Sequence, residues 1–330
     1  MKAVCVTEHG GSEVLQLQEV PTPEPGPGQV RIRVAATTVN FADSRHPAYT
    51  AGAPPFIPGL EAAGTIDVIG PGVQGLQAGQ RVAALAGGGS YAEYVLARAV
   101  GVFALPDSLD SERAACFRVV GQTSFNLLTA AGRLQPGETV LVHAAAGGVG
   151  STVVQLARVL GAGRIIGTVG SRQKADLIQE LGADVAINYR EENVAERVRA
   201  ATDGAGADVV LDGVGADTFE ASLASLAPLG RLVVFGQSSG PRPPVVLPPI
   251  GENKSIIGYS SGGLFRSRPE APRAPGLAAL TPLVQGRWSP LISARFPLGK
   301  PRRNACMKVR SAPPARIGRM SSSAAVRTER

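Results

Sequence analysis

The chain has 330 residues, long enough for two domains of ordinary size, and its hydrophobic fraction of 44% is sufficient for full cores. Its 41 glycines and 26 prolines follow no period, which excludes a collagen-like chain. No apolar run approaches the roughly 18 residues of a membrane span, and the N-terminus becomes polar too early for a signal peptide.

The cysteines and the charges narrow the class further. The 3 cysteines are far apart and odd in number, which argues against a disulfide framework and makes a cytoplasmic enzyme the expectation. The net charge of +7 is uneven, because residues 300–330 carry nine Lys/Arg and one acid, and residues 1–299 therefore sum to −1. The body of the chain is close to neutral, and the basic charge belongs to its end, where it would suit nucleic acid or an acidic membrane.

The N-terminal part predicts short β-strands. Residues 1–38 alternate apolar and polar side chains in short runs around the turn-rich segment Pro21–Gly28. Glycine or proline punctuates the runs that follow. The expected strands are Lys2–Thr7, Val30–Val34, Gly64–Gly70, Arg81–Ala84 and Tyr91–Leu96.

From about residue 123 the pattern changes to an alternation of strands and helices. Strands are expected at 139–143, 164–169, 184–188, 208–212, 231–235 and 255–259. Helices are expected at 149–161, 171–181, 191–202 and 215–226. Six strands joined by helical crossovers predict a doubly wound parallel sheet, so the fold class is α/β.

The pattern weakens after Ser260. Three prolines, at 269, 272 and 275, interrupt what would otherwise be one helix. A short helix is expected over Leu277–Gln285, and extended chain over Trp288–Pro297.

The most informative motif lies between the first of the six strands and the first helix. The spacing Ala145-x-Gly147-x-x-Gly150 is a dinucleotide-binding fingerprint with alanine in place of the first glycine. A helix that begins at such a turn offers backbone N–H groups and the positive end of its dipole to a pyrophosphate. The alternative is a glycine turn that only packs a helix against a strand.

The second strand of this region indicates which dinucleotide would bind. NAD sites place an acidic residue about 20 residues beyond the fingerprint, where it binds the ribose hydroxyls. No acid follows Arg164–Val169, and Ser171, Arg172 and Lys174 stand there instead. Cations in a first helical turn oppose the helix dipole, so an anion nearby is favoured over a merely solvated turn. NADP is therefore preferred over NAD.

Residues 1–299 resemble the zinc-independent quinone oxidoreductases of the medium-chain dehydrogenase/reductase superfamily. The matching stretches, in the family's order, are Val39–Asp43, Pro58–Gly64, Gly89–Tyr94, His143–Gly150, Gly167–Ser171 with Lys174, and Asp212–Gly215. The resemblance implies a GroES-like β-barrel catalytic domain at 1–122, an NADP-binding Rossmann domain at 123–260, a return segment at 261–299 and a homodimer. Residues 300–330 are left as an atypical basic tail.

The resemblance also implies site residues. Asn40, Tyr49 and Thr123 are expected near the nicotinamide and substrate, with the Asn40 amide donating to the substrate carbonyl; the alternatives are a turn residue for Asn40 and a half-buried core aromatic for Tyr49. The residues expected to bind the cofactor are Ala146, Gly147, Gly148, Val149, Gly150, Ser171, Lys174, Tyr189, Gly236 and Ser238.

Metal chemistry is not expected. The zinc-dependent branch carries a catalytic cysteine, a Gly-His-Glu motif and four structural cysteines. Here the corresponding stretches read Asn40–Asp43 and Gly59–Glu61, and the three histidines, His9, His46 and His143, lack ligand-like neighbours. His143 is expected at a strand end beside the glycine turn.

The expected function is NADPH-dependent reduction of quinones by hydride transfer without metal. The first alternative is reduction of the C=C bond of enones or alkenals on the same scaffold. The second is a non-catalytic NADPH-binding protein whose basic end binds nucleic acid, which the lack of aromatic residues beyond Phe296 disfavours. Small-molecule acceptors are thus the expected partners.

The chain departs from the family pattern in two places. The segment Asp43–Tyr49 is shorter than usual, so the active-site loop is expected to differ. After Gly299 the resemblance stops, and we hypothesise a reading-frame slip, since codon degeneracy permits a family-like end in a shifted frame. A plain disordered tail ranks second and a nucleic-acid arm third. The slip would remove a closing strand and leave a sheet edge unpaired. We therefore expect this chain to be less stable than its in-frame version, and equal thermal midpoints for the two proteins would refute that expectation.

Overall fold

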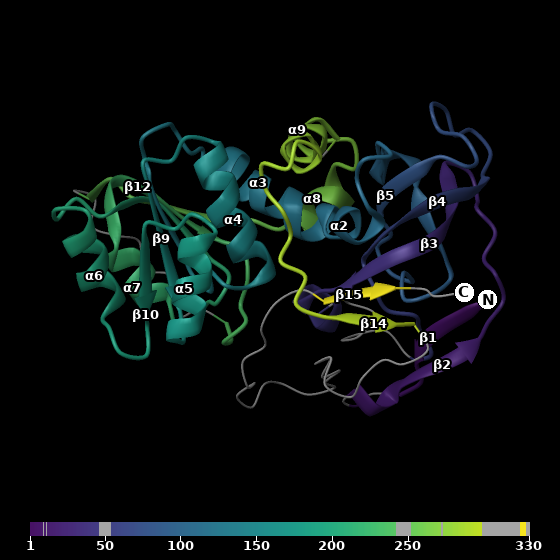
Figure 1. Cartoon of the computed structure of the whole chain (residues 1–330), viewed down its shortest axis with the longest axis horizontal. Coiled ribbons are helices and arrows are strands. Elements are labelled where there is room, and N and C mark those ends of the chain that lie inside the picture. The colour runs from purple at the N-terminus through teal and green to yellow at the C-terminus, as the bar shows by residue number, and fades with distance from the viewer. Residues whose placement is uncertain are drawn as a thin grey trace.

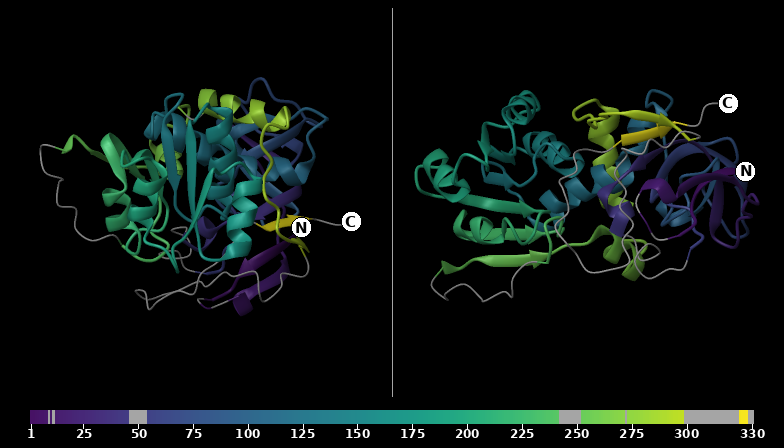
Figure 2. Two further views of the ribbon diagram at one scale, coloured as in Figure 1. Left: turned by 60° about the vertical axis from the view of Figure 1, so that its left-hand side comes forward. Right: turned by 90° about the horizontal axis from the view of Figure 1, so that it is seen from below.

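Two sheets form the two ends of the molecule, and a group of helices lies between them (Figure 1). The computed structural model describes residues 1–8, 10, 12–45, 54–241, 252–271, 273–298 and 324–327. One of these sheets is mainly antiparallel, the other has six parallel strands, and a third, small sheet among the described residues has two antiparallel strands. Figure 2 shows the same division from two other sides. The predicted α/β class, with a β-domain and a doubly wound sheet, is confirmed.

The antiparallel part is built around one long strand. β3 (Gln29–Val39) pairs with β4 (Glu61–Ile69) along most of its length and with β6 (Tyr94–Arg98) near its start. Its side chains alternate between the core and the outside, as the sequence pattern predicts. The remaining strands here are β1 (Lys2–Val6), β2 (Leu15–Glu19), β5 (Arg81–Leu85), β7 (Val102–Ala104) and β14 (Arg295–Pro297). The sequence did not predict β2 and β7, which are short.

The end of the chain contributes a strand to this sheet. β15 (Ala324–Arg327) lies between β14 and β3, antiparallel to β3, with Ala324 opposite Val39 and Arg327 opposite Ala36. The expectation of an unpaired edge is therefore wrong: ladder hydrogen bonds come from the backbone, so a short stretch of unrelated sequence can occupy the position. The cause of the divergent sequence stays a hypothesis.

The parallel sheet has the strand order β10-β9-β8-β11-β12-β13. Its strands are β8 (Thr139–Val142), β9 (Arg164–Val169), β10 (Val185–Asn188), β11 (Ala207–Asp212), β12 (Leu226–Val234) and β13 (Ser255–Gly258). The crossover helices are α4 (Gly148–Val159), α5 (Arg172–Glu180), α6 (Val194–Ala201) and α7 (Phe219–Ala224). All six strands and all four helices were predicted within a few residues, apart from the early start of β12.

A helical stretch joins the two sheets. It runs through α2 (Ser111–Ala115), η4 (Phe117–Gly121), α3 (Gln122–Asn126) and η5 (Leu127–Ala131). We call residues 117–131 the junction helix. Two later helices, α8 (Ser261–Ser267) and α9 (Arg273–Val284), lie beside it (Figure 1). The sequence predicted part of α9 but not the junction helix.

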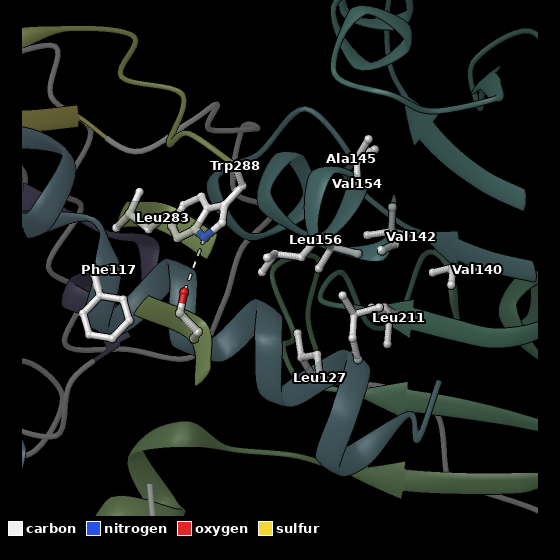
Figure 3. Packing of buried hydrophobic residues seen from close by; sticks show 14 of the residues in the cluster. Phe117, Leu127, Val140, Val142, Ala145, Val154, Leu156, Leu211, Leu283 and Trp288 are labelled. Carbon is white, nitrogen blue, oxygen red and sulfur yellow. Dashed lines mark hydrogen bonds between the residues drawn. The ribbon is translucent and has the colours of Figure 1, made fainter. Parts of the chain in front are cut away.

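One hydrophobic core runs through both sheets and the junction helix. It contains Ala83 and Phe103 of the antiparallel part together with Val140 and Leu211 of the parallel sheet. Figure 3 shows Phe117 and Leu127 of the junction helix in this cluster together with Trp288, Leu156 of α4 and Leu211 of the parallel sheet; the Trp288 indole N–H donates to the Ala279 carbonyl at 3.5 Å. The two sheets are therefore held by shared packing, not only by the chain connections.

Leu229 is the place where the backbone of the parallel sheet is least suited to its residue. It has a φ of 64° and a side chain 71% exposed, at an irregularity of β12 next to Gly230. A non-glycine residue in this left-handed region costs about 1–2 kcal/mol. We expect Leu229→Gly to raise the free energy of unfolding by about 1 kcal/mol, measured by denaturant titration. The same change at Leu277, half exposed within α9, should lower the free energy of unfolding. A loss of stability in both variants would contradict the inference that the backbone at Leu229 is strained.

Candidate active site

The glycine turn between β8 and α4 leaves backbone N–H groups available at the helix start. Gly147 is the N-cap of α4, and no side chain caps the helix. The first bond of the helix runs from the Ser151 N–H to the Gly147 carbonyl at 2.8 Å, so the amides just before Ser151 point out of the helix end. A Cβ on Gly150 would lie 2.4 Å from the Ala144 carbonyl oxygen. The turn therefore needs glycine there and suits a phosphate group.

The end of β9 presents a hydroxyl and two cations. Ser171 is the N-cap of α5, yet its hydroxyl makes no capping bond. Arg172 and Lys174 are exposed in the first turn of α5, and neither forms an ion pair within the described parts of the chain. Tyr189 directly follows β10, half buried, and its N–H donates to the Val169 carbonyl at 3.1 Å. These groups lie at adjacent strand ends and suit a phosphate on the adenosine side of a dinucleotide.

The loops after β11 and β12 approach each other closely. The Ser238 N–H donates to the Gly213 carbonyl at 3.3 Å. A Cβ on Gly236 would lie 2.5 Å from the same carbonyl oxygen. Both predicted residues thus lie at the carboxyl edge of the sheet, where doubly wound folds bind ligands.

A buried polar network lies beneath the glycine turn. His143 follows β8, as predicted, and its ring bonds Thr168 Oγ1 at 3.1 Å and Ser222 Oγ at 3.0 Å. Ser222 donates in turn to Asp212 at 3.0 Å, and Asp212 also accepts the N–H groups of Val214 and Gly215. Burial lowers the pKa of His143, an effect that Asp212 partly offsets. The network fixes the strand ends below the site and was not predicted.

Asn40 directly follows β3 and is held by the buried Glu61 carboxyl. Its amide Nδ2 donates to Thr38 Oγ1 at 2.8 Å and to Glu61 Oε1 at 3.0 Å, so both amide hydrogens are used inside the protein. Thr38 also donates to Glu61 Oε1, and the Val119 N–H donates to Glu61 Oε2 at 2.6 Å. The expected donation from Asn40 to a substrate carbonyl does not agree with this arrangement. The Asn40 carbonyl oxygen is the end of the amide without a partner among the described residues.

Glu61 shares its surroundings with a buried arginine. Arg118 lies over the Phe103 ring at 4.5 Å from its centroid, and its Nε and Nη1 have no hydrogen-bond partner in the described structure. Burial lowers the pKa of Arg118 to about 10, while the charge of Glu61 acts in the opposite direction. Burial likewise raises the pKa of Glu61, whereas its hydrogen-bond donors and the charge of Arg118 lower it. Each of the two buried groups therefore favours the charged form of the other.

Asp43 closes the turn after Asn40. Its Oδ2 accepts the Asn40 N–H at 2.6 Å and the Tyr91 hydroxyl at 3.0 Å, and its buried Oδ1 has no partner within the described part of the chain. Burial, together with the nearby charge of Glu61, raises the pKa of Asp43 to about 7 despite these hydrogen bonds. Tyr49, the other residue expected in this segment, lies outside the described residues.

Asp43 should make the stability of the protein depend on pH. An unfolded chain releases the aspartate proton near pH 4, whereas the folded protein keeps it to about pH 7, so this group's contribution to the free energy of unfolding falls between those values and is constant above them. We expect Asp43→Asn to remove a slope of up to about 1.4 kcal/mol per pH unit, measured by chemical unfolding from pH 4.5 to 8. The exposed Asp107→Asn should leave the slope unchanged. Equal slopes in all three proteins would contradict the assignment.

Thr123 lies between the two halves of the site. It belongs to α3, and its Oγ1 is 2.8 Å from Ser261 Oγ, just beyond β13. The next residue, Ser124, donates to the Val149 carbonyl in the first turn of α4 at 3.1 Å. Sequence reasoning missed Ser261, which stands 138 residues from Thr123.

The described residues therefore bring most of the predicted cofactor positions to one edge of the parallel sheet. The uncapped start of α4, the close approach at Gly150 and the unused Ser171 hydroxyl are the features that an adenine dinucleotide phosphate would fill. The residues present thus fit NADPH.

In the part of the chain that the structure describes, no group of three or more His, Cys, Asp or Glu side chains is placed to hold a metal ion. No helix in that part of the chain is long and apolar enough to cross a membrane.

The chain matches known proteins over both of its parts. The family model "Alcohol dehydrogenase GroES-like domain" matches residues 26–107, and "Zinc-binding dehydrogenase" matches residues 148–274. The chain is 41% identical to a quinone oxidoreductase of Salmonella typhimurium over 268 residues, which cover 79% of this chain and 78% of the relative. It is 38% identical to a 2-haloacrylate reductase of a Burkholderia species over 276 residues, covering 81% and 80% of the two chains.

A solved structure agrees with this similarity. The quinone oxidoreductase of Escherichia coli, solved as a complex with NADPH, superposes with a TM-score of 0.84 at 30% identity, covering 99% of this chain and 100% of the other. The GroES-like and Rossmann-type architecture is thus shared. From these matches and the fold, the chain belongs to the quinone oxidoreductase family of the medium-chain dehydrogenase/reductase superfamily and is an oxidoreductase of that family.

Proposed function

We propose that the protein reduces quinones with NADPH by hydride transfer and without a metal ion. The observation that carries the proposal is the uncapped glycine turn of α4, placed one strand away from the Ser171 hydroxyl and from Lys174, which forms no ion pair with any described residue. The Escherichia coli quinone oxidoreductase, solved with NADPH, supports the same cofactor. The side chains that bond Asn40 are the Thr38 hydroxyl and the buried Glu61 carboxyl, and in the described part of the chain no group of three or more His, Cys, Asp or Glu side chains is placed to hold a metal ion such as a catalytic zinc.

Different residues would bind different parts of the cofactor. Ala146, Gly147, Gly148, Val149 and Gly150 would hold the pyrophosphate, and Ser171, Lys174 and Tyr189 the adenosine phosphate. Gly236 and Ser238 would approach the nicotinamide ribose, and Asn40 and Thr123 would adjoin the nicotinamide ring. When bound, NADPH supplies the hydride. The protein's part is to position the two reactants, and the reduced quinone oxygens take their protons from water.

The exposed cations predict the coenzyme preference. We expect the double change Arg172→Ala and Lys174→Ala to lower kcat/KM for NADPH by roughly tenfold to a hundredfold, because two charge-assisted contacts to the 2′-phosphate are lost. The value for NADH, which lacks that phosphate, should change little. Steady-state kinetics with both coenzymes measures the ratio, and Arg98→Ala, at the far end of β6, serves as the control. A parallel loss for NADPH and NADH would contradict the assignment.

A panel of acceptors tests the function itself. NADPH oxidation is followed by its absorbance with a quinone, with an enone and with a 2-haloacrylate, since a relative is named for that last substrate. Rapid oxidation with the quinone supports the proposal. Oxidation with only the enone or haloacrylate supports the second candidate, a C=C reductase. Binding of NADPH without oxidation by any acceptor would leave a non-catalytic NADPH-binding protein.

We also propose that the protein is a homodimer with the domain limits 1–122, 123–260 and 261–299. β13 is an outer strand of the parallel sheet and pairs only with β12 among the described strands. An edge strand of this kind is available for pairing with a second copy of the chain. Light scattering at several concentrations tests it, and a mass of one chain throughout would contradict it.

A further inference from the structure

Four polar side chains form a chain of hydrogen bonds at the carboxyl edge of the parallel sheet. Asn126 Nδ2 donates to the Tyr259 hydroxyl oxygen at 2.8 Å, and Ser261 Oγ donates to the same oxygen at 3.2 Å. Thr123 Oγ1 lies 2.8 Å from Ser261 Oγ. These residues come from the junction helix on one side and from β13 and the start of α8 on the other.

The direction of these bonds follows from counting hydrogens. A serine hydroxyl has one hydrogen, and Ser261 gives it to Tyr259. Ser261 therefore accepts from Thr123, and the Thr123 hydroxyl hydrogen is used within the protein. What Thr123 has left to offer is the pair of acceptor positions on its oxygen.

The neighbours of Thr123 behave differently. Thr129, on the same helical stretch, donates to the Phe125 carbonyl four residues earlier at 2.8 Å, and the single hydroxyl hydrogen of Ser124 is shared between the Val120 carbonyl four residues earlier at 2.8 Å and the Val149 carbonyl at 3.1 Å. This local bond is the usual one for helical Ser and Thr. The Thr123 hydroxyl instead bonds across to Ser261, a residue of a different element.

The position of Thr123 indicates which group it would meet. The adjacent Ser124 bonds the first turn of α4, where the pyrophosphate would lie, and Ser261 follows β13. The adenosine phosphate would lie on the opposite side, at β9 and α5. A dinucleotide that crosses the carboxyl edge from β9 past α4 therefore brings its nicotinamide half toward Thr123.

We infer that Ser261, bonded to Tyr259, is a positioning residue that makes Thr123 a hydrogen-bond acceptor for the N–H₂ group of the nicotinamide carboxamide. The inference rests on the proposed NADPH function and adds the orientation of the carboxamide to it. The carboxamide carries one acceptor, its carbonyl, and one donor, its N–H₂ group. A Thr123 oxygen that can only accept selects the N–H₂ group and so fixes which way the carboxamide is turned.

The test compares NADPH with its reduced 3-acetylpyridine analogue, in which a methyl group replaces the N–H₂ group. Dissociation constants are measured by fluorescence titration without any acceptor, so turnover is not needed. The wild-type protein should bind the analogue about threefold to tenfold more weakly than NADPH, the effect of one neutral hydrogen bond. In Ser261→Ala the Thr123 hydrogen is free to donate to the carbonyl that both compounds carry, so the ratio of the two constants should fall toward one.

Matched variants separate positioning from general damage. Tyr259→Phe should lower the ratio as well, because the Ser261 hydrogen is then free to turn toward Thr123. Ser261→Thr keeps the hydroxyl and should restore the wild-type ratio. Ser267→Ala removes a hydroxyl from the same helix that bonds only backbone carbonyls, and it should leave the ratio unchanged. If Ser261 had only a structural role, its replacement would weaken the binding of both compounds equally, and the ratio of their dissociation constants would not change.

The outcomes are distinguishable from those of the function test. A wild-type ratio of one, or a ratio that Ser261→Ala does not change, overturns the inference alone. Binding of NADPH without reduction of quinone or enone overturns the proposed function, while the ratios still decide the inference. Absence of NADPH binding in the folded wild-type protein overturns both.

Discussion

Gly150→Ala is expected to weaken NADPH binding by roughly a hundredfold or more. The added Cβ would lie 2.4 Å from the Ala144 carbonyl oxygen and 2.7 Å from Ala145 Cα, distances that real Cβ atoms do not adopt. Both obstacles are backbone atoms of the turn that follows β8, so relief requires α4 to move away from that turn. The N–H groups that would bind the pyrophosphate move with the helix, and two lost charge-assisted bonds of about 1.5 kcal/mol or more each account for the factor.

Gly147→Ala gives the graded comparison on the same turn. Its Cβ would lie 3.2 Å from the same Ala144 carbonyl oxygen, which a shift of a few tenths of an ångström relieves. In fluorescence titrations with NADPH, the affinity should therefore decrease from wild type to Gly147→Ala to Gly150→Ala. Circular dichroism checks that each variant is folded. Wild-type affinity in a folded Gly150→Ala variant would show that the turn is not the phosphate site.

Glu61→Ala is expected to be the most destabilising of the single changes. It removes the acceptor of Thr38, Asn40 and the Val119 N–H, and it leaves the buried Arg118 without its opposite charge. Removing one of two interacting buried charges together with the acceptor of three buried donors is expected to cost about 3–5 kcal/mol. The free energy of unfolding in urea measures the loss, and Glu61→Gln, which keeps the volume and one acceptor oxygen, should lose less.

A second change separates the charge from the hydrogen bonds. If the buried Arg118 charge causes part of the loss, then Arg118→Met in the Glu61→Ala background should recover some stability, because the methionine fills a similar space without a charge. The recovery appears as a non-additive double-mutant cycle. Additive losses from the two changes would contradict the dependence of Arg118 on Glu61.

The parallel sheet was predictable because its signals are local. Strands such as Thr139–Val142 and Arg164–Val169 are short buried runs that end in glycine turns, and the Ala145–Gly150 spacing marks the helix start within the same stretch. The junction helix was missed for the opposite reason. Its residues 117–131 are buried on nearly every side, so the apolar periodicity that reveals a surface helix is lost.

The site was predictable in position but not in its hydrogen bonding. Asn40 and Thr123 were found through resemblance, yet what their polar atoms do depends on Glu61 and Ser261, which pair with them only in the fold. In the sequence Glu61 stands between Leu60 and Ala62, and nothing there indicates that it accepts an Asn40 hydrogen. Donor and acceptor roles at this site are thus decided by tertiary contacts, which no spacing in the sequence reveals.

The unbroken packing from Phe103 through the junction helix to Leu211 has a consequence for how the protein responds to its cofactor. Two bodies that share one core unfold together, because neither can lose its packing without exposing the apolar surface of the other. If NADPH binds at the parallel sheet as proposed, the free energy gained on binding stabilises the entire cooperative unit. The β-domain that carries Asn40, although it would contact only the nicotinamide end, would then gain the same protection against unfolding as the strands proposed to hold the phosphates.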